Sequence, residues 1–119
     1  MTRSYQIFHN PRCSKSRETL ALLQQQGIEP EIILYLETPP SHTELKQLLQ
    51  KLGMSARELM RVKEDEYKAQ GLSDPSLTED ALIEAMVNTP KLIERPIVVT
   101  QNKAALGRPP EKVLEIIQA

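Results

Sequence analysis

The apolar residues of this chain form short runs near its two ends and follow helical spacing in its middle. Tyr5–His9 is a short β-prone run that stops at an Asn-Pro pair. Glu31–Leu36 is a nearly continuous apolar run, of the kind that is buried on both faces of a parallel sheet. Between them, Leu20 and Leu23, with Gly27 as the stop, predict a helix. This part of the chain therefore predicts a strand–helix–strand unit.

Residues 41–89 predict a block of helices. A capping box at Ser41–Glu44 opens the first helix, in which leucines follow at helical spacing. A second capping box, Ser55–Glu58, opens a shorter helix that we expect to reach Arg61. Thr78 opens a third helix, whose apolar residues share one face.

The C-terminal part predicts two strands and a helix. Ile97–Thr100 is a β-branched strand, Gln101–Asn102 is a turn, and Lys103–Leu106 returns as the hairpin partner. Pro109–Pro110 then precedes the last helix. We expect its apolar face to hold Val113, Leu114 and Ile117.

In order, these elements predict an α/β chain of the thioredoxin-like class: a βαβ unit and then ββα, with a small mixed sheet and a helical insertion between the second and third strands. At 119 residues the chain fits one domain, residues 1–119, with the insertion at about 41–89.

Charge and hydropathy limit the kinds of binding partner and the cellular location that we expect. The 15 basic and 16 acidic residues give a net charge of −1 without a long basic run, which argues against broad electrostatic binding to nucleic acid or membrane. The apolar runs are far shorter than the roughly 20 residues that cross a bilayer, and the N-terminus lacks the apolar segment of a signal peptide. We therefore expect a cytoplasmic protein. We also expect it to be a monomer.

Cys13 is the single cysteine, which excludes an intramolecular disulfide, a paired-cysteine redox motif and a cysteine-rich zinc site. It falls between the first predicted strand and the first turn of the next helix. A helix N-terminus favours thiolate over thiol, can lower a cysteine pKa from about 8.5 to between about 3.5 and 7.5, and binds anions. Arg12, Lys15 and Arg17 add positive charge. The pattern therefore indicates a nucleophilic thiolate beside an anion site, with a small buried apolar cysteine as the alternative.

Ser16 stands where a Cys-x-x-Cys pair has its second cysteine. Its hydroxyl can donate a hydrogen bond to a thiolate but cannot resolve an oxidised product, so a second thiol must come from outside the chain. A phosphatase loop would need arginine at the position of Thr19, which argues against that class.

The segment His9–Arg17 resembles the active-site loop of the glutaredoxin- and glutathione-coupled arsenate reductases, an ArsC-like family with a thioredoxin-like fold and a helical insert. The resemblance covers nearly the whole chain. Further matching segments are Ile33–Glu37, Pro39–Ser41, Glu58–Arg61, Arg95–Thr100 and Gly107–Pro109.

The resemblance implies that Cys13 is the nucleophile, that Arg61, Arg95 and Arg108 surround the oxyanion, and that His9 helps to keep the thiol ionised. The planar fork of a guanidinium independently suits a tetrahedral oxyanion. The alternatives are ordinary surface cations for the arginines and a strand-terminating hydrogen bond for His9.

The activity implied is reduction of arsenate to arsenite through a covalent adduct on Cys13, with glutathione and glutaredoxin as external reductants and without a bound cofactor or metal. One alternative is a related thiol oxidoreductase acting on another substrate, such as a glutathione mixed disulfide. Another is a binding protein like the Spx-type regulators, although these switch on a Cys-x-x-Cys pair and Ser16 replaces its second cysteine. The resemblance also implies a cis peptide bond before Pro96, and we expect His42 to be a solvated surface residue.

Overall fold

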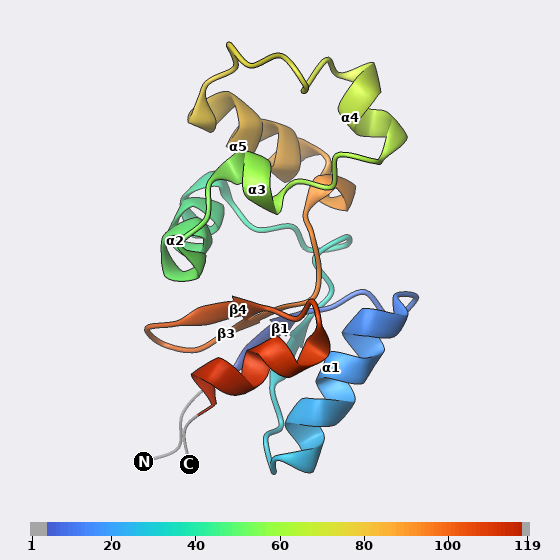
Figure 1. Cartoon of the computed structure of the whole chain (residues 1–119), viewed down its shortest axis with the longest axis vertical. Helices are drawn as coiled ribbons and strands as arrows, with labels where there is room; N and C mark the ends of the chain where they lie inside the picture. The colour runs from blue at the N-terminus through green and yellow to red at the C-terminus, as the bar shows by residue number, and fades with distance from the viewer. Residues whose placement is uncertain (1–4, 118–119) are drawn as a thin grey trace. The chain divides into compact units, whose positions relative to one another are not determined.

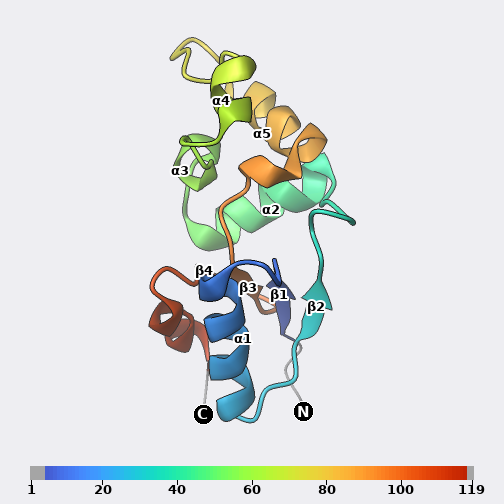
Figure 2. The ribbon, with the colours of Figure 1, turned by 90° about the vertical axis from the view of Figure 1, so that its right-hand side faces the viewer.

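The computed structural model describes residues 5–117, which form the mixed α/β architecture that the sequence predicts. The chain divides into two compact units (Figures 1 and 2). The sheet unit combines the described residues up to Thr38 with those from Arg95 onward, and the helical unit is Pro39–Glu94. The helical unit contains the predicted insertion, whereas its assignment to one domain with the sheet remains a prediction.

The sheet has four strands in the order β2-β1-β3-β4. Strand β1 (Gln6–Phe8) runs parallel to β2 (Glu31–Ile33) and antiparallel to β3 (Ile97–Val99), which forms an antiparallel hairpin with β4 (Ala104–Leu106). The predicted hairpin is therefore confirmed. The register aligns the last residue of β1 with the first of β3 and the last of β4. The chain therefore leaves β1 and β4, and enters β3, at the same end of the sheet.

Strand β2 differs from its prediction. It ends at Ile33, and the backbone then turns, with the N–H groups of Glu37 and Thr38 both donating to the carbonyl of Leu34. Ile32 is 48% exposed, so the prediction of burial on both faces is wrong. Because β2 lies at the edge of the sheet and pairs only with β1 among the described strands, its apolar residues are not enclosed from both sides.

Helix α1 (Ser14–Gln25) and the 3₁₀ helix η2 (Pro110–Ile116) pack against each other and enclose the core of the sheet unit (Figure 1). Gly27, with φ of 77°, follows the end of α1 as predicted. Because a 3₁₀ helix has about three residues per turn, its positions i and i+3 align. Val113 and Ile116 are therefore buried. Of the three residues predicted to form the apolar face, Val113 is buried and Ile117 is partly buried against the core, whereas the prediction for Leu114 is wrong, since it is 40% exposed. One cluster of buried core residues consists of Tyr5, Ile7, Leu23, Val98, Ala105, Val113 and Ile116.

The helical unit begins each of its first two helices with a complete capping box. Ser41 caps α2 and Ser55 caps α3, and in each case the glutamate three residues later accepts from the N–H group of the serine. Gly53, with φ of 68°, ends α2. Helix α4 was not predicted, because only one of its side chains, Tyr67, is buried. The elements are α2 (His42–Leu52), α3 (Ala56–Leu59), α4 (Asp65–Ala69), α5 (Glu79–Asn88) and η1 (Pro90–Leu92).

Helix α3 ends before Arg61, contrary to prediction. Met60 is buried, has an extended backbone, and pairs with Ile93 in an isolated antiparallel bridge. The N–H group of Arg61 then donates to the carbonyl of Leu92 at 2.7 Å. Pairing with a segment distant in sequence thus replaces the last helical turn that the local pattern indicates.

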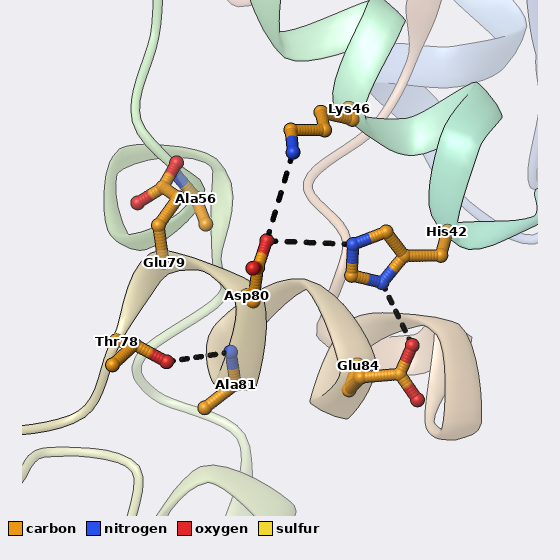
Figure 3. Close-up of polar contacts among 8 residues, drawn as sticks. All are labelled: His42, Lys46, Ala56, Thr78, Glu79, Asp80, Ala81 and Glu84. Carbon is orange, nitrogen blue, oxygen red and sulfur yellow. Dashed lines mark hydrogen bonds and ion pairs between the residues drawn. The ribbon is translucent and has the colours of Figure 1, made fainter.

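His42 links α2 to α5 and is less solvated than predicted. Its Nδ1 lies 2.7 Å from Glu84 Oε1 and its Nε2 lies 3.5 Å from Asp80 Oδ1, which also lies 3.9 Å from Lys46 Nζ (Figure 3). The side chain of His42 is one-third exposed. Within residues 5–117, none of the helices combines the length and apolar character needed to traverse a bilayer.

Candidate active site

A tight turn carries the chain from β1 into α1 and places Cys13 at the helix start. The side-chain carbonyl of Asn10 accepts a hydrogen bond from Arg12 N at 3.0 Å, and its backbone carbonyl accepts one from Cys13 N at 2.9 Å. Cys13 is the N-cap of α1, with an extended backbone and a partly exposed side chain. The predicted position of the cysteine, between strand and helix, is confirmed. Asn10 is a site residue that sequence reasoning missed, although its neighbour proline signals the turn.

The electrostatic surroundings of Cys13 favour an anion. Helix α1 has 12 residues and no acidic side chain in its first turn, so the positive end of its dipole is not offset there. Arg17, one turn into the helix, donates from Nη1 to the carbonyl of Pro11 at 2.8 Å and so holds a guanidinium beside the turn. A helix start of this kind is suited to binding an oxyanion.

His9 and Ser16 form a buried pair behind the turn. His9 Nδ1 lies 2.5 Å from Ser16 Oγ, and Ser16 Oγ also accepts a hydrogen bond from Asn10 N at 3.1 Å. Ser16 is fully buried and His9 is 6% exposed. Burial, and secondly the positive charge of Arg17, lower the pKa of His9 below its usual 6.5. His9 is therefore a neutral imidazole at pH 7 in this structure.

Ser16 directs its hydrogen bonds away from the cysteine. Its hydroxyl contacts His9 and Asn10, and no contact with Cys13 Sγ is found among the described residues. This arrangement differs from the predicted hydrogen bond between the Ser16 hydroxyl and the thiolate. The reason is that Ser16 lies on the buried side of α1, while Cys13 at the helix start is partly exposed.

Arg95 and Arg108 lie at the end of the sheet where β1 ends and His9 follows it. Because Phe8 pairs with Ile97 and Ile97 with Leu106, the segments before β3 and after β4 leave the sheet beside the end of β1. Arg108 Nε donates to the carbonyl of Arg95 at 3.0 Å, which joins the two arginine segments directly. The Nε and Nη1 atoms of Arg95 are buried from solvent.

Both arginines precede a cis proline. The predicted cis peptide before Pro96 is confirmed, and a second, unpredicted one precedes Pro109. Gly107 N donates to the carbonyl of Pro96 at 2.8 Å, which holds the two segments side by side. Gly107 is a second site residue that sequence reasoning did not assign, because its close approach to α1 becomes apparent only in three dimensions.

Arg61 belongs to the helical unit. Its Nη1 lies 3.1 Å from Glu64 Oε2 and its Nε lies 3.5 Å from Glu94 Oε1. A role for Arg61 in binding an oxyanion therefore remains a prediction. The other predicted site residues all belong to the sheet unit: His9, Cys13, Ser16, Arg95 and Arg108. Within residues 5–117, His, Cys, Asp and Glu side chains form no group of three or more that could hold a metal ion.

Comparison with known proteins identifies the family. Residues 8–116 match the ArsC family model. The chain is 64% identical over 118 residues to the uncharacterized protein YfgD of Escherichia coli K12, covering 98% of this chain and 99% of that relative. It is 54% identical over 112 residues to an arsenate reductase of Neisseria meningitidis Z2491, covering 93% and 96%. The solved arsenate reductase of Vibrio cholerae superposes with a TM-score of 0.95 at 58% identity, covering 98% of this chain and 100% of that one. The chain belongs to the ArsC family.

Proposed function

We propose that this protein reduces arsenate to arsenite through a covalent adduct on Cys13. The observation that carries the proposal is the position of Cys13 at the N-terminus of α1, at the end of the sheet where Arg108 donates a hydrogen bond to the Arg95 carbonyl. A nucleophile and an oxyanion site at one place are what this reaction requires. The relatives from Neisseria meningitidis and Vibrio cholerae that are named arsenate reductases support the choice of arsenate.

In the first step, the Cys13 thiolate attacks arsenic. A sulfur–arsenic bond forms and an arsenic–oxygen bond breaks, the oxygen leaving as water once protonated, while arsenic remains As(V). Arg95 and Arg108, and by family resemblance Arg61, would neutralise the negative charge of the oxyanion.

Glutathione then supplies the electrons. Its thiolate attacks the Cys13 sulfur, so that a disulfide bond forms and the sulfur–arsenic bond breaks with its electron pair remaining on arsenic. Arsenite, As(III), leaves, and Cys13 is left as a mixed disulfide with glutathione. Glutaredoxin removes the glutathionyl group and regenerates the thiolate, which this single-cysteine chain cannot do for itself.

The experiment is a coupled assay of arsenate-dependent oxidation of glutathione in the presence of glutaredoxin. The Cys13→Ser variant should be inactive, because a serine hydroxyl is not ionised at neutral pH. Arg108→Lys should lose roughly ten- to a hundredfold in kcat/KM, because an ammonium cannot form two parallel hydrogen bonds with an oxyanion. Lys103→Ala is the matched control: its exposed side chain lies in the turn between β3 and β4, at the opposite end of these strands from Arg95 and Arg108, so activity should stay within a few-fold. Full activity of Cys13→Ser would refute the proposal.

A second candidate function is reduction of a glutathione mixed disulfide by the same cysteine. It uses the same Cys13 at the start of α1, and the 64% identical relative YfgD, which is uncharacterized, leaves the substrate open. Turnover of a glutathionylated peptide without any response to arsenate would select this function. Turnover of arsenate alone would exclude it.

A further inference from the structure

The short contact between His9 and Ser16 requires a hydrogen atom between the two side chains. Ser16 Oγ and His9 Nδ1 lie 2.5 Å apart, too close for two acceptors facing each other. Either the Ser16 hydroxyl donates to Nδ1, or Nδ1–H donates to the hydroxyl oxygen. The two cases place the single hydrogen of a neutral imidazole on opposite ring nitrogens.

The hydrogen bonds of Ser16 decide between these cases. Asn10 N–H already donates to Ser16 Oγ at 3.1 Å, and His9 is the only other group that contacts this oxygen among the described residues. If His9 Nδ1–H were also a donor, the hydroxyl hydrogen of fully buried Ser16 would have no acceptor. A buried donor without an acceptor is strongly disfavoured. The Ser16 hydroxyl therefore donates to His9 Nδ1.

The electrostatics of His9 agree with this hydrogen-bond accounting. Burial and the nearby Arg17 guanidinium lower the pKa of His9, so the ring carries one hydrogen at pH 7. Because Nδ1 accepts from Ser16, that hydrogen is on Nε2. The Arg17 side chain is held near the turn by its hydrogen bond to the carbonyl of Pro11.

We propose that Ser16 is a positioning residue that holds His9 as the neutral Nε2–H tautomer, so that the ring offers an N–H donor at Nε2 and not a positive charge. Ser16, which stands where a Cys-x-x-Cys motif has its second cysteine, then selects the tautomer of His9 by donating a hydrogen bond to Nδ1. The use of this donor in catalysis rests on the proposed reduction of arsenate, whereas the tautomer itself is a property of the resting protein.

The tautomer is tested by ¹⁵N NMR of protein labelled at histidine. The chain has two histidines, so loss of one signal set in His9→Gln and of the other in His42→Gln assigns both. The expected spectrum of the wild type at pH 7 shows His9 with a protonated Nε2 and a bare Nδ1. A protonated Nδ1, or an imidazolium, would overturn the proposal.

Variants of Ser16 test whether its hydroxyl selects the tautomer of His9. In Ser16→Ala we expect His9 to shift toward the Nδ1–H tautomer or a mixture, whereas Ser16→Thr keeps a hydroxyl and should keep the Nε2–H form. A spectrum of Ser16→Ala identical to that of the wild type would show that Ser16 does not select the tautomer and would refute this role of Ser16. The circular dichroism spectrum of each variant establishes that it is folded, and the wild-type spectrum remains decisive if Ser16→Ala does not fold.

Activity tests the role of the donor. Glutamine at position 9 offers an amide N–H donor at a similar reach but cannot become a cation, whereas leucine offers no donor. We expect His9→Gln to retain arsenate turnover within about tenfold and His9→Leu to lose roughly ten- to a hundredfold more, as for a hydrogen bond to a charged group. Equal loss in both variants would refute the donor role. Absence of arsenate turnover in the wild type would refute the proposed function, while the NMR result would still decide the tautomer.

Discussion

Gly107 lies against Thr19 of α1 so closely that a Cβ atom at position 107 would be 2.7 Å from Thr19 Oγ1. The same Cβ would be 2.8 Å from Pro96 Cγ. The Thr19 hydroxyl is itself held by donating to the carbonyl of Lys15 at 2.8 Å, and Thr19 is fully buried. Gly107 is therefore the point at which the two proline-containing segments rest on the helix that carries Cys13.

Gly107→Ala should destabilise the protein by about 1–3 kcal/mol, because the added methyl group must displace packed atoms on two sides. Urea denaturation measures this change in the free energy of unfolding. Combining it with Thr19→Ala, which removes one of the two close contacts, should recover part of the loss. Additive effects of the two substitutions would argue against direct contact between these positions.

His9 makes the stability of the protein depend on pH. Its pKa is lowered in the folded state, so on acidification the unfolded chain takes up a proton near pH 6.5 that the folded chain resists. The unfolding free energy should therefore be unaffected by this group well above pH 6.5 and should fall below it, by at most about 1.4 kcal/mol per pH unit.

Comparison of the wild type with His9→Gln isolates this contribution, because the other titrating groups are common to both proteins. Urea denaturation at pH 7.5 and 5.5 should show a smaller loss of stability for the variant. Equal losses would mean that His9 does not resist protonation in the folded state.

Ser41 should contribute about 1 kcal/mol through its capping box at the start of α2. Its hydroxyl accepts from Glu44 N at 3.1 Å, and Glu44 Oε1 accepts from Ser41 N at 2.9 Å. Ser41→Ala should lower stability by this amount, measured by thermal or urea unfolding, while Ser41→Asp should preserve most of it because aspartate is also a good N-cap. If the alanine and aspartate variants were equally destabilised, the cap would not be the source of the effect.

Arg57 should anchor the segment that follows α4. Its Nη1 donates to Tyr67 Oη at 2.9 Å and to the carbonyl of Leu72 at 2.7 Å, and its Nη2 donates to the carbonyl of Asp74 at 3.0 Å. A lysine has a single nitrogen and cannot span these acceptors. Arg57→Lys should therefore cost about 1–2 kcal/mol and increase amide hydrogen exchange in residues 70–77.

The control for Arg57→Lys is Lys68→Ala, which removes an exposed cation from α4. A surface substitution of this kind should change stability by less than about 0.5 kcal/mol and leave exchange in residues 70–77 unchanged. If both variants behaved alike, the hydrogen bonds of Arg57 would not order this segment.

Elements with local signals could be predicted from the sequence. The capping box of Ser41 and the left-handed Gly53 mark both ends of α2, and the turn after β1 places Cys13 at a helix start. Elements that depend on distant partners could not. Ile32 is exposed on the edge strand β2, which pairs with one strand among the described residues, and α3 stops because Met60 pairs with Ile93.

The site residues also divide into those with local signals and those that depend on distant partners. The position of Cys13 follows from its neighbours in sequence, and the cis peptide bond before Pro96 follows from the family resemblance. The partners of Ser16 depend on which side of α1 packs against the sheet, and the closeness of Gly107 to Thr19 depends on strand register. A pattern of apolar residues specifies a buried face but not which polar atoms meet there.

The covalent route through Cys13 is tested most directly by intact mass spectrometry after incubation with arsenate and glutathione, with glutaredoxin omitted. The covalent route predicts that the wild type gains the mass of one glutathionyl group, that the gain requires arsenate, and that Cys13→Ser does not show it. An unchanged wild-type mass accompanied by arsenite release, or the same gain in Cys13→Ser, would contradict it.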